Sequence, residues 1–470
     1  MSNETALESK AILLFLTIIA ITFVGGMFLT KISIGITFAV IGAVIMAVVC
    51  FMNPELGLYI LVCAMLLGPQ FGFGDSAGES VRGRGVTLRL DDLLLLIIGF
   101  SWFLSTAIHK ERGLFLKTPL NRYIAAYFLV CLVSTLIGYL MGSVKGMAGI
   151  FFVIKYFEYY IVYFMAVNYL KEKKQMERLV FTMLIVCLIV CVVGIYQVPS
   201  GRRVSAPFEG ETGEPNTLGG YLVLMLSLVL GLLLNKYGTT KQKFFFGGLV
   251  FFILITLAAT LSRSSWLALV PMLLALIYFN KRKMVVIMPL LFVIILSAFL
   301  LPSGVKQRVM FTFSQPLEQG QLAVGAVRID TSTSARLNSW KKVMTKDFIK
   351  HPLLGYGVTG YKFLDAQYPR VLAETGFAGL FSFIALLIAI YKNALQTRRQ
   401  YEDDPFYLGV STGFLAGFFA MLTHAIGSNT FIIVRIMEPF WFLTAILIMI
   451  PQIAHLPDTS ESHQRLMKPI

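Results

Sequence analysis

Residues 334–380 read SARLNSWKKVMTKDFIKHPLLGYGVTGYKFLDAQYPRVLAETGFAGL and form a polar segment set between hydrophobic runs. Arginine, lysine, aspartate, glutamate, histidine and tyrosine are concentrated here, whereas most of the flanking sequence is apolar enough for a lipid bilayer. Charges are costly inside hydrocarbon, so this segment is expected to lie outside the membrane. We therefore expect the chemistry of the protein to be carried by this segment.

The composition of the whole chain defines the broad class of protein. Of 470 residues, 57% are hydrophobic and only 14% are charged, and the mean hydropathy is +0.76. Apolar runs long enough to cross about 30 Å of hydrocarbon as helices recur along the whole length. We expect an all-α polytopic integral membrane protein with about 12–14 transmembrane helices. The candidate spans lie near 11–29, 33–52, 56–69, 92–108, 121–141, 148–169, 179–198, 217–235, 244–261, 264–280, 284–301, 376–391, 405–426 and 430–451.

These spans divide the chain into four parts. Residues 1–301 are predicted to be an N-terminal transmembrane helix bundle, and residues 302–375 a long outer-side catalytic loop that contains short amphipathic helices. Residues 376–452 are predicted to be C-terminal transmembrane helices, and residues 453–470 a cytoplasmic tail.

The distribution of basic residues predicts the orientation. Lysine and arginine are enriched in the short connections after even-numbered spans, which should therefore be cytoplasmic. The loop 302–375 then faces the opposite side. This bias accounts for most of the net charge of +15, so no nucleic-acid partner is expected. No metal or other cofactor is expected either, because the five cysteines form no CxxC pair and Asp91-Asp92 lacks further ligands.

Several arginines on the outer side are not explained by topology. Guanidinium groups bind phosphate bidentately and stay charged, so they could hold a lipid pyrophosphate at the membrane surface. The alternative is that some only snorkel to lipid headgroups. The candidates for pyrophosphate or glycan binding are Arg202, Arg203, Arg263, Arg336 and Arg370.

The outer segment has its own helical pattern. Within 336–350, apolar side chains recur at helical spacing at Leu337, Trp340, Met344 and Phe348, which predicts an amphipathic helix in the membrane interface. A purely structural surface helix has the same pattern. The glycines of 355–360 then predict a turn-rich connection to a second short helix.

Motifs along the chain carry a family resemblance. HPLLGYGVTGY at 351–361 and DAQYPRVLAETGFAGL at 365–380 resemble the signature region of the O-antigen ligase and polysaccharide polymerase superfamily, the WaaL and Wzy type. Further pieces resemble the family's pattern in the same order. They are NPELGLY at 53–59, LRLDDLLLL at 88–96, GRRVSAPFEGETGEPNTLGGYL at 201–222 and LSRSSWLALV at 261–270.

The resemblance implies a GT-C-like membrane glycosyltransferase in the bacterial inner membrane. Such enzymes take a glycan from an undecaprenyl-pyrophosphate carrier on the outer leaflet and pass it to an acceptor hydroxyl, without a nucleotide sugar. Polymerases use a second lipid-linked repeat unit as acceptor, and ligases use the lipid A core. A chain-length regulator and a flippase of the same pathway are the implied partners.

One departure separates the two activities. Ligases commonly carry a histidine where this chain has Asp365. Many polymerase-like members resemble this chain in having aspartate at that position. We therefore expect a polymerase first and a ligase second. Pro369 is a second departure, since a leucine is more usual at that position.

The expected reaction suggests roles for individual residues. The attacking sugar hydroxyl needs a base within hydrogen-bond reach, and Asp365 is the first choice. Glu374 is the second choice, although a carboxylate near a helix start can simply stabilise the helix dipole. His351 is the ligase-like alternative. Tyr356 and Tyr368 can stack on sugar rings or anchor the headgroup region.

Two other classes of function remain open from the sequence. A lipid-linked oligosaccharide flippase has a comparable number of spans, but it should show an internal repeat and charges along a midplane pathway. A scaffolding membrane protein would not need arginines and carboxylates gathered on one side. The buried ionisable candidates are Lys155 and Glu158, which can pair at i, i+3, and His424, Arg435 and Glu438 near the outer surface.

Overall fold

The computed structural model of the protein describes most of residues 42–68, 94–100, 116–145, 148–207, 213–280 and 331–454, with a few residues between these ranges. The predicted span 11–29 lies outside the described residues. The spans near 33–52, 92–108 and 284–301 lie outside them in part or in large part, as does the tail 453–470.

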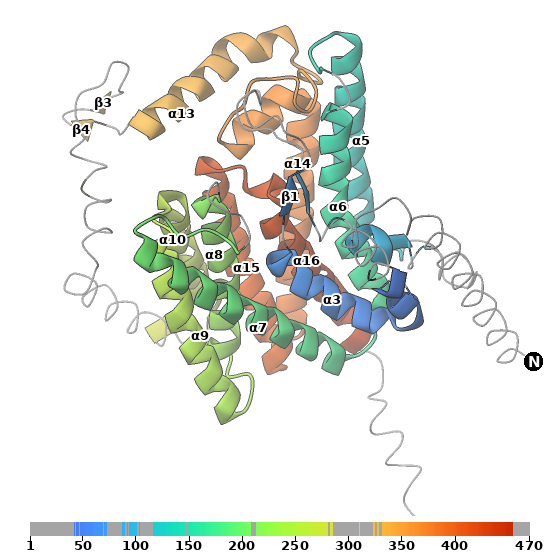
Figure 1. Ribbon diagram of the computed structural model, residues 1–470, viewed down its shortest axis with the longest axis vertical. Helices are drawn as coiled ribbons and strands as arrows, with labels where there is room; N and C mark the ends of the chain where they lie inside the picture. Colours follow the sequence, from blue (N-terminus) through green and yellow to red (C-terminus); the bar gives the residue numbers. More distant parts are fainter. Residues whose placement is uncertain are drawn as a thin grey trace, which may run out of the picture.

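Helices dominate the described part of the chain (Figure 1). The helices are α3 Pro54–Leu67, α5 Asn121–Leu140, α6 Ala148–Tyr169, α7 Lys173–Gln197, α8 Pro215–Leu234, α9 Thr240–Ala259, α10 Arg263–Phe279, α13 Thr331–Lys342, α14 Gln367–Gln400, α15 Pro405–Gly427 and α16 Val434–Ala454. The short elements are η1 Val198–Ser200, η3 Val343–Asp347, η4 Phe348–Lys350 and η5 Thr430–Ile432, with the antiparallel pairs β1 Gln70–Gly72 with β2 Thr87–Arg89 and β3 Ala323–Val324 with β4 Val327–Arg328.

Within the described residues, eight helices are long and apolar enough to cross a membrane. They are α5, α6, α7, α8, α9, α14, α15 and α16, and α3 and α10 are shorter apolar helices. The expected fold class, an all-α polytopic membrane protein, is confirmed. The short α3 occupies the region of the predicted span 56–69.

Local sequence signals set where the helices begin. The Asp404 carboxylate accepts hydrogen bonds from the backbone N–H groups of Phe406 and Tyr407 and so caps α15. The Ser262 hydroxyl accepts from the Ser265 N–H at the start of α10. Thr239 and Gln242 form a capping box at the start of α9. These polar caps satisfy helix ends where the chain leaves the apolar layer.

Small residues allow α8 and α15 to pack closely in the centre of the bundle. A Cβ atom added at Gly231 of α8 would lie 2.4 Å from the Gly409 carbonyl oxygen and 2.5 Å from the Gly413 nitrogen of α15. One added at Gly413 would lie 2.7 Å from the Ser227 carbonyl oxygen. Close backbone approach at small residues is the usual way in which membrane helices associate.

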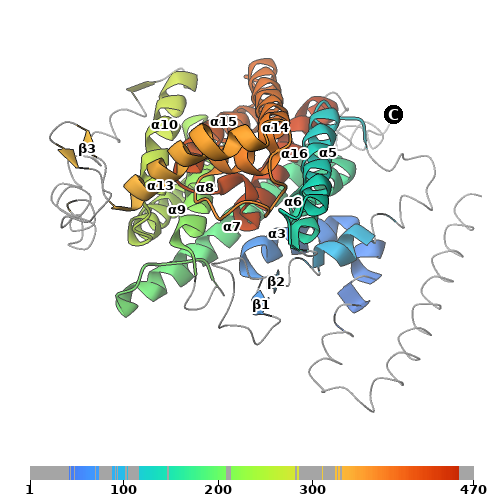
Figure 2. The ribbon, with the colours of Figure 1, turned by 90° about the horizontal axis from the view of Figure 1, so that it is seen from above.

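The helix ends define two opposite faces of the molecule. At one end, Lys173, the first residue of α7, forms an ion pair with Asp404 just before α15. At the same end, Arg398 of α14 donates to the carbonyl oxygen of Phe279 at the end of α10. We call this end the basic face. Helices α8, α10, α14 and α16 begin at the other end, which we call the site face. Helix α13 lies across the site face, crosswise to the long helices (Figures 1 and 2).

The predicted helical conformation over 336–350 is confirmed, and it continues from α13 through the π-helix η3 and the 3₁₀-helix η4. Its apolar side chains divide into two sets. Val343 is buried beside Leu364 and Ala373, whereas Leu337 and Met344 are exposed, as suits a helix that lies in the membrane interface.

The predicted start of a span at residue 376 coincides with a sharp bend in α14. Gly376 has φ 63° and ψ −161°, a conformation that interrupts the helix and favours glycine. Residues 367–375 thus form the predicted second short helix, and the membrane-spanning part follows. Pro369 is tolerated because it lies in the first helical turn, where backbone N–H groups have no intrahelical partner.

Candidate functional site

Two predicted site residues form an ion pair on the site face. The Arg336 Nη2 atom of α13 lies 2.6 Å from the Asp365 Oδ2 atom, in the connection just before α14. The side chains keep 27% and 40% of their surface exposed, respectively. The pair is therefore charge-assisted, ordered and accessible to a substrate.

Other helix ends converge on this pair. A Cβ atom added at Gly427, the last residue of α15, would lie 3.2 Å from the Ser264 Cβ atom and 3.9 Å from the Arg336 Nη1 atom. The Arg336 guanidinium therefore lies beside the end of α15 and the start of α10. Glu214 lies just before the start of α8, where partial burial and the charge of Asp365 raise its pKa.

A buried hydroxyl network lies beneath Arg336. The His424 Nε2 atom lies 3.1 Å from the Ser265 hydroxyl and 3.4 Å from the Ser264 hydroxyl, and its Nδ1 atom lies 2.8 Å from the Thr430 hydroxyl. His424 is fully buried. Ser262 extends the network by donating to the Asn216 side-chain oxygen at 2.8 Å. The network fixes the ends of α8, α10 and α15 relative to one another.

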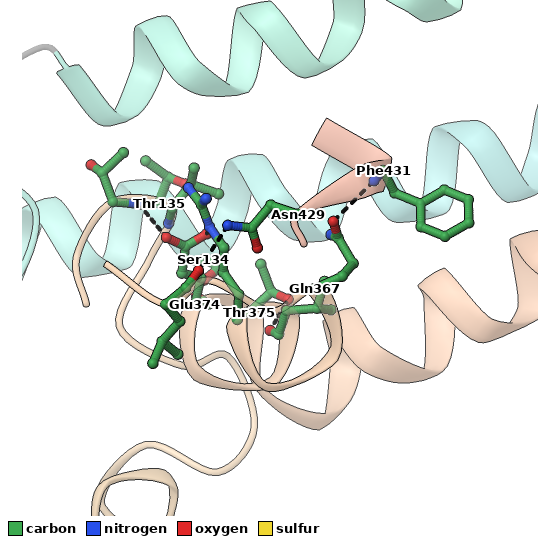
Figure 3. A network of polar contacts seen from close by, with 12 residues as sticks. Ser134, Thr135, Gln367, Glu374, Thr375, Asn429 and Phe431 are labelled. Atoms are coloured by element: carbon green, nitrogen blue, oxygen red, sulfur yellow. Dashed lines mark hydrogen bonds and ion pairs between the residues drawn. The ribbon is translucent and has the colours of Figure 1, made fainter. Parts of the chain in front are cut away.

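Hydrogen bonds between side chains and backbone groups hold the loop that carries Asp365 on both sides. The Asn429 side chain donates to the carbonyl oxygen of Leu364 at 2.8 Å, and the Gln367 side chain accepts from the Phe431 N–H at 3.0 Å (Figure 3). Both Asn429 and Gln367 are buried. The position of the Asp365 backbone is therefore set from the α15–α16 connection.

Glu374 and Arg370 form a second ion pair, which is buried. The Arg370 Nε atom lies 3.2 Å from the Glu374 Oε2 atom, and only 6% and 4% of the side-chain surfaces are exposed. The Glu374 Oε1 atom accepts from the Thr359 N–H at 3.2 Å, and its backbone carbonyl accepts from Ser134 of α5 at 2.8 Å (Figure 3). These contacts anchor the 355–360 turn against α5.

His351 and the predicted tyrosines pack among themselves or onto the bundle. The His351 and Tyr356 rings lie edge to face at 4.5 Å, and the Tyr356 hydroxyl donates to the Asp347 carbonyl oxygen at 2.9 Å. Tyr361 donates to the Asp347 carboxylate, and burial together with this bond raises the Tyr361 pKa. The Tyr368 hydroxyl donates to the Leu422 carbonyl oxygen at 2.7 Å, which ties α14 to α15.

The remaining predicted arginines lie at the α9–α10 turn and in the connection between α7 and α8. Arg203 donates to the carbonyl oxygens of Thr260 at 3.0 Å and Leu261 at 3.3 Å. It therefore provides hydrogen-bond donors for carbonyl groups at the end of α9. Arg202 is exposed beside it, and Arg263 is the first residue of α10, next to Ser264. Their positions bring extra positive charge to the same face as Arg336.

The buried charges inside the bundle belong to other contacts. The Lys155 ammonium pairs with Glu158 at 3.1 Å, as predicted from their spacing, and also with Asp92. Arg435 donates to the carbonyl oxygens of Pro207 at 2.8 Å and Gly68 at 3.3 Å. Among the described residues, no three His, Cys, Asp or Glu side chains are grouped so that they could hold a metal ion.

The fold and the site together define an integral membrane protein with an accessible Arg–Asp pair at one face of its helix bundle. Residues 247–389 match a family model described as O-antigen ligase. This match, over part of the chain, supports membership of the O-antigen ligase and polysaccharide polymerase superfamily. The matched region contains Arg263, Arg336 and Asp365. Among curated proteins, none matches the chain significantly.

Sequence reasoning missed part of the site. It named Arg336 and Asp365 separately but not their contact, and it noted His424 only as a buried candidate. Glu214, Asn216 and Asn429 were not among the predicted site residues. Their place at polar helix ends on the side predicted to face outward was the available signal.

Proposed function

We propose that the protein transfers a glycan from an undecaprenyl-pyrophosphate carrier to an acceptor sugar hydroxyl, and that it thereby polymerises the repeat units of a surface polysaccharide. The single observation that carries this proposal is the Arg336–Asp365 pair, which is ordered by the surrounding helix ends yet partly exposed. The family match supports the reaction class.

Asp365 acts as the general base in this proposal. A sugar hydroxyl has a pKa far above neutrality, so its attack is assisted by a carboxylate that accepts the proton as the new bond forms. The adjacent Arg336 guanidinium donates to one oxygen of Asp365 and so orients the carboxylate. The acceptor oxygen then bonds to the anomeric carbon of the donor glycan, and the bond from that carbon to the pyrophosphate breaks.

The departing pyrophosphate takes the bonding electron pair, so negative charge develops on the carrier. Fixed cations at that position stabilise the transition state more than the ground state. Arg336 is the central cation, and Arg263, Arg202 and Arg203 are the candidates for binding the rest of the phosphate groups. The His424 hydroxyl network is assigned to positioning, because it is buried beneath Arg336.

Glu374 and Arg370 are assigned to positioning as well, because their side chains form an ion pair with each other inside the fold. His351 and Tyr356 lie against each other at the outer edge of the same segment. They are proposed to contact the glycan, and Tyr368 to fix α14 through its bond to Leu422. Asp365 remains the preferred base because its carboxylate is more exposed than that of Glu374.

The polymerase activity is proposed ahead of the ligase activity because aspartate occupies the position where ligases commonly have histidine. Transfer of finished polymer to lipid A core is the alternative. In either case we propose the bacterial inner membrane as the location, with the site face directed outward. A flippase would supply the carrier-linked glycan, and a chain-length regulator would act on the product.

The polysaccharide profile of the native host tests these alternatives. In a strain without this gene, glycan arrested at one repeat unit indicates a polymerase, and long polymer that stays on the lipid carrier indicates a ligase. The wild-type gene should restore the profile, whereas Arg336→Ala and Asp365→Ala should not at matched membrane levels. An unchanged profile in a strain that also lacks any paralogous gene contradicts the proposal.

A further inference from the structure

A pocket of about 390 Å³ lies at the basic face, at the opposite end of the bundle from Arg336. It is formed where α7 begins, α8 ends and α9 begins. Helix α8 runs 20 residues from the site face to this pocket, and such a helix is about 30 Å long. The pocket is therefore separate from the proposed reaction centre.

The pocket has a charged rim and an apolar floor. Lys174, Glu177 and Arg178 lie on the first turns of α7, and the lining residues Phe181 and Leu184 follow one to two turns deeper on the same helix. Leu232 of α8 and Phe246 of α9 complete the floor, and both are buried. The change from charged to apolar along α7 follows the direction from the membrane surface into the hydrocarbon.

The carboxylate in the rim already has a hydrogen-bond donor. The Tyr237 hydroxyl bonds to Glu177, and burial together with the Glu177 charge raises the Tyr237 pKa, so the phenol stays protonated. The Lys174 ammonium and the Arg178 guanidinium project from the same side of α7, four residues apart. Arg178 lies 3.8 Å from Glu55, at the outer limit of an ion pair, and 61% of its side-chain surface is exposed.

We propose that this pocket binds an anionic phospholipid of the leaflet at the basic face. The lipid phosphate would lie between Lys174 and Arg178, and the first part of an acyl chain would cover Phe181, Leu184 and Phe246. Basic pockets between membrane helices suit such headgroups because the charge pairs at the surface while the chain stays in an apolar environment. This inference is independent of the proposed glycan transfer.

Retention of lipid by the purified full-length protein tests the proposal. The protein is reconstituted in nanodiscs that contain phosphatidylglycerol or only phosphatidylcholine, and bound lipid is counted by native mass spectrometry after release. Removing both cations in Lys174→Gln/Arg178→Gln should weaken phosphatidylglycerol retention about 25-fold, since each basic group near a lipid headgroup contributes a factor of roughly five. The control Lys392→Gln/Arg399→Gln removes two exposed charges on α14 at the same face and should retain the lipid.

The thermal unfolding midpoint gives a second readout. Phosphatidylglycerol should raise the midpoint of the wild type and of the control more than that of the pocket variant. Equal retention and equal midpoint shifts in all three proteins would overturn the proposal, because the effect would then be general surface charge. A full shift from soluble glycerol phosphate alone would also overturn it, since a lipid chain would not be required. If the double variant does not fold, Lys174→Gln alone is compared by lipid count with Lys392→Gln, and equal counts contradict the proposal.

Discussion

At the scale of single residues, Asp365 depends on two independent supports. Arg336 pairs with its carboxylate, while Asn429 and Gln367 fix the backbone on either side of it. A general base must be held close to the productive geometry, because a small displacement of the proton acceptor lowers the rate strongly. The ion pair and the backbone contacts together explain how an exposed connection can provide such a base.

Glu214 gives a prediction about stability and pH. Partial burial and the Asp365 charge raise its pKa, so the folded state binds a proton at Glu214 more tightly than the unfolded state does. Below the ordinary glutamate pKa of about 4, the protonated form contributes stability. This contribution is lost as the pH rises through the raised pKa of Glu214. Glu214→Gln should therefore be favoured over the wild type increasingly as pH rises toward 7.

Thermal unfolding midpoints of the two proteins in the same detergent, measured across this range, check the prediction. A constant difference between the wild type and Glu214→Gln would show that Glu214 titrates normally. The control Glu402→Gln changes an exposed carboxylate at the basic face and should leave the pH dependence unchanged.

At the scale of elements, the sequence predicted the positions of helices better than their contacts. The span start at residue 376 was visible because Gly376 follows a polar stretch and precedes an apolar run, and the structure bends there. The pair Lys155–Glu158 was visible because residues at i, i+3 share a helix face. The contact of His424 with Ser265 was not, since it joins residues 159 apart.

The bend at Gly376 should tolerate no side chain. A Cβ atom there would lie 2.4 Å from the Leu353 carbonyl group, and φ is positive. Gly376→Ala should cost about 2 kcal/mol or more of stability and reduce polymer length, because it displaces the segment that holds Asp365. Thermal unfolding and the polysaccharide profile measure the two effects. Gly248→Ala is the control, since nothing lies within 4 Å of its Cβ position; a variant at Gly376 as stable as this control would refute the prediction.

The packing of α8 against α15 gives a second prediction for the elements. Gly231→Val places methyl groups where the Gly409 and Gly413 backbones now lie, so the two helices must separate. The variant should lose thermal stability and monodispersity in size-exclusion chromatography. Gly247→Val adds the same side chain at a position of α9 with nothing within 4 Å and should behave as the wild type. Equal behaviour of both variants would show that the close approach is dispensable.

At the scale of the whole molecule, the two faces differ in chemistry. Those predicted basic connections that the structure describes gather at one end, and the helix starts with Glu214, Arg263 and Asp365 gather at the other. Hydropathy and charge bias were sufficient to predict this polarity. The composition of the site was only partly predictable, because the side chains that surround Arg336 come from α8, α10 and α15 and meet only in the folded bundle.

The orientation of the faces can be measured directly. After replacement of the exposed Cys63 by serine, Lys342→Cys on α13 should react with a membrane-impermeant maleimide added outside spheroplasts. Lys392→Cys on α14 should react only after permeabilisation. Labelling in the opposite order would reverse the proposed orientation and place the Arg336–Asp365 pair in the cytoplasm.

The central claim is that Asp365 removes the proton of the acceptor hydroxyl beside Arg336. The most direct test is the rate of glycan transfer by purified protein, with lipid-linked repeat units extracted from the strain without this gene. Asp365→Asn keeps the shape of the side chain but not its basicity, and its rate should fall at least a hundredfold, in the range of about 10²–10⁴ expected for a general base. Asp403→Asn, at an exposed carboxylate of the basic face, should keep the wild-type rate. A rate for Asp365→Asn within about twofold of the wild type would contradict the claim, because a general base contributes far more than that.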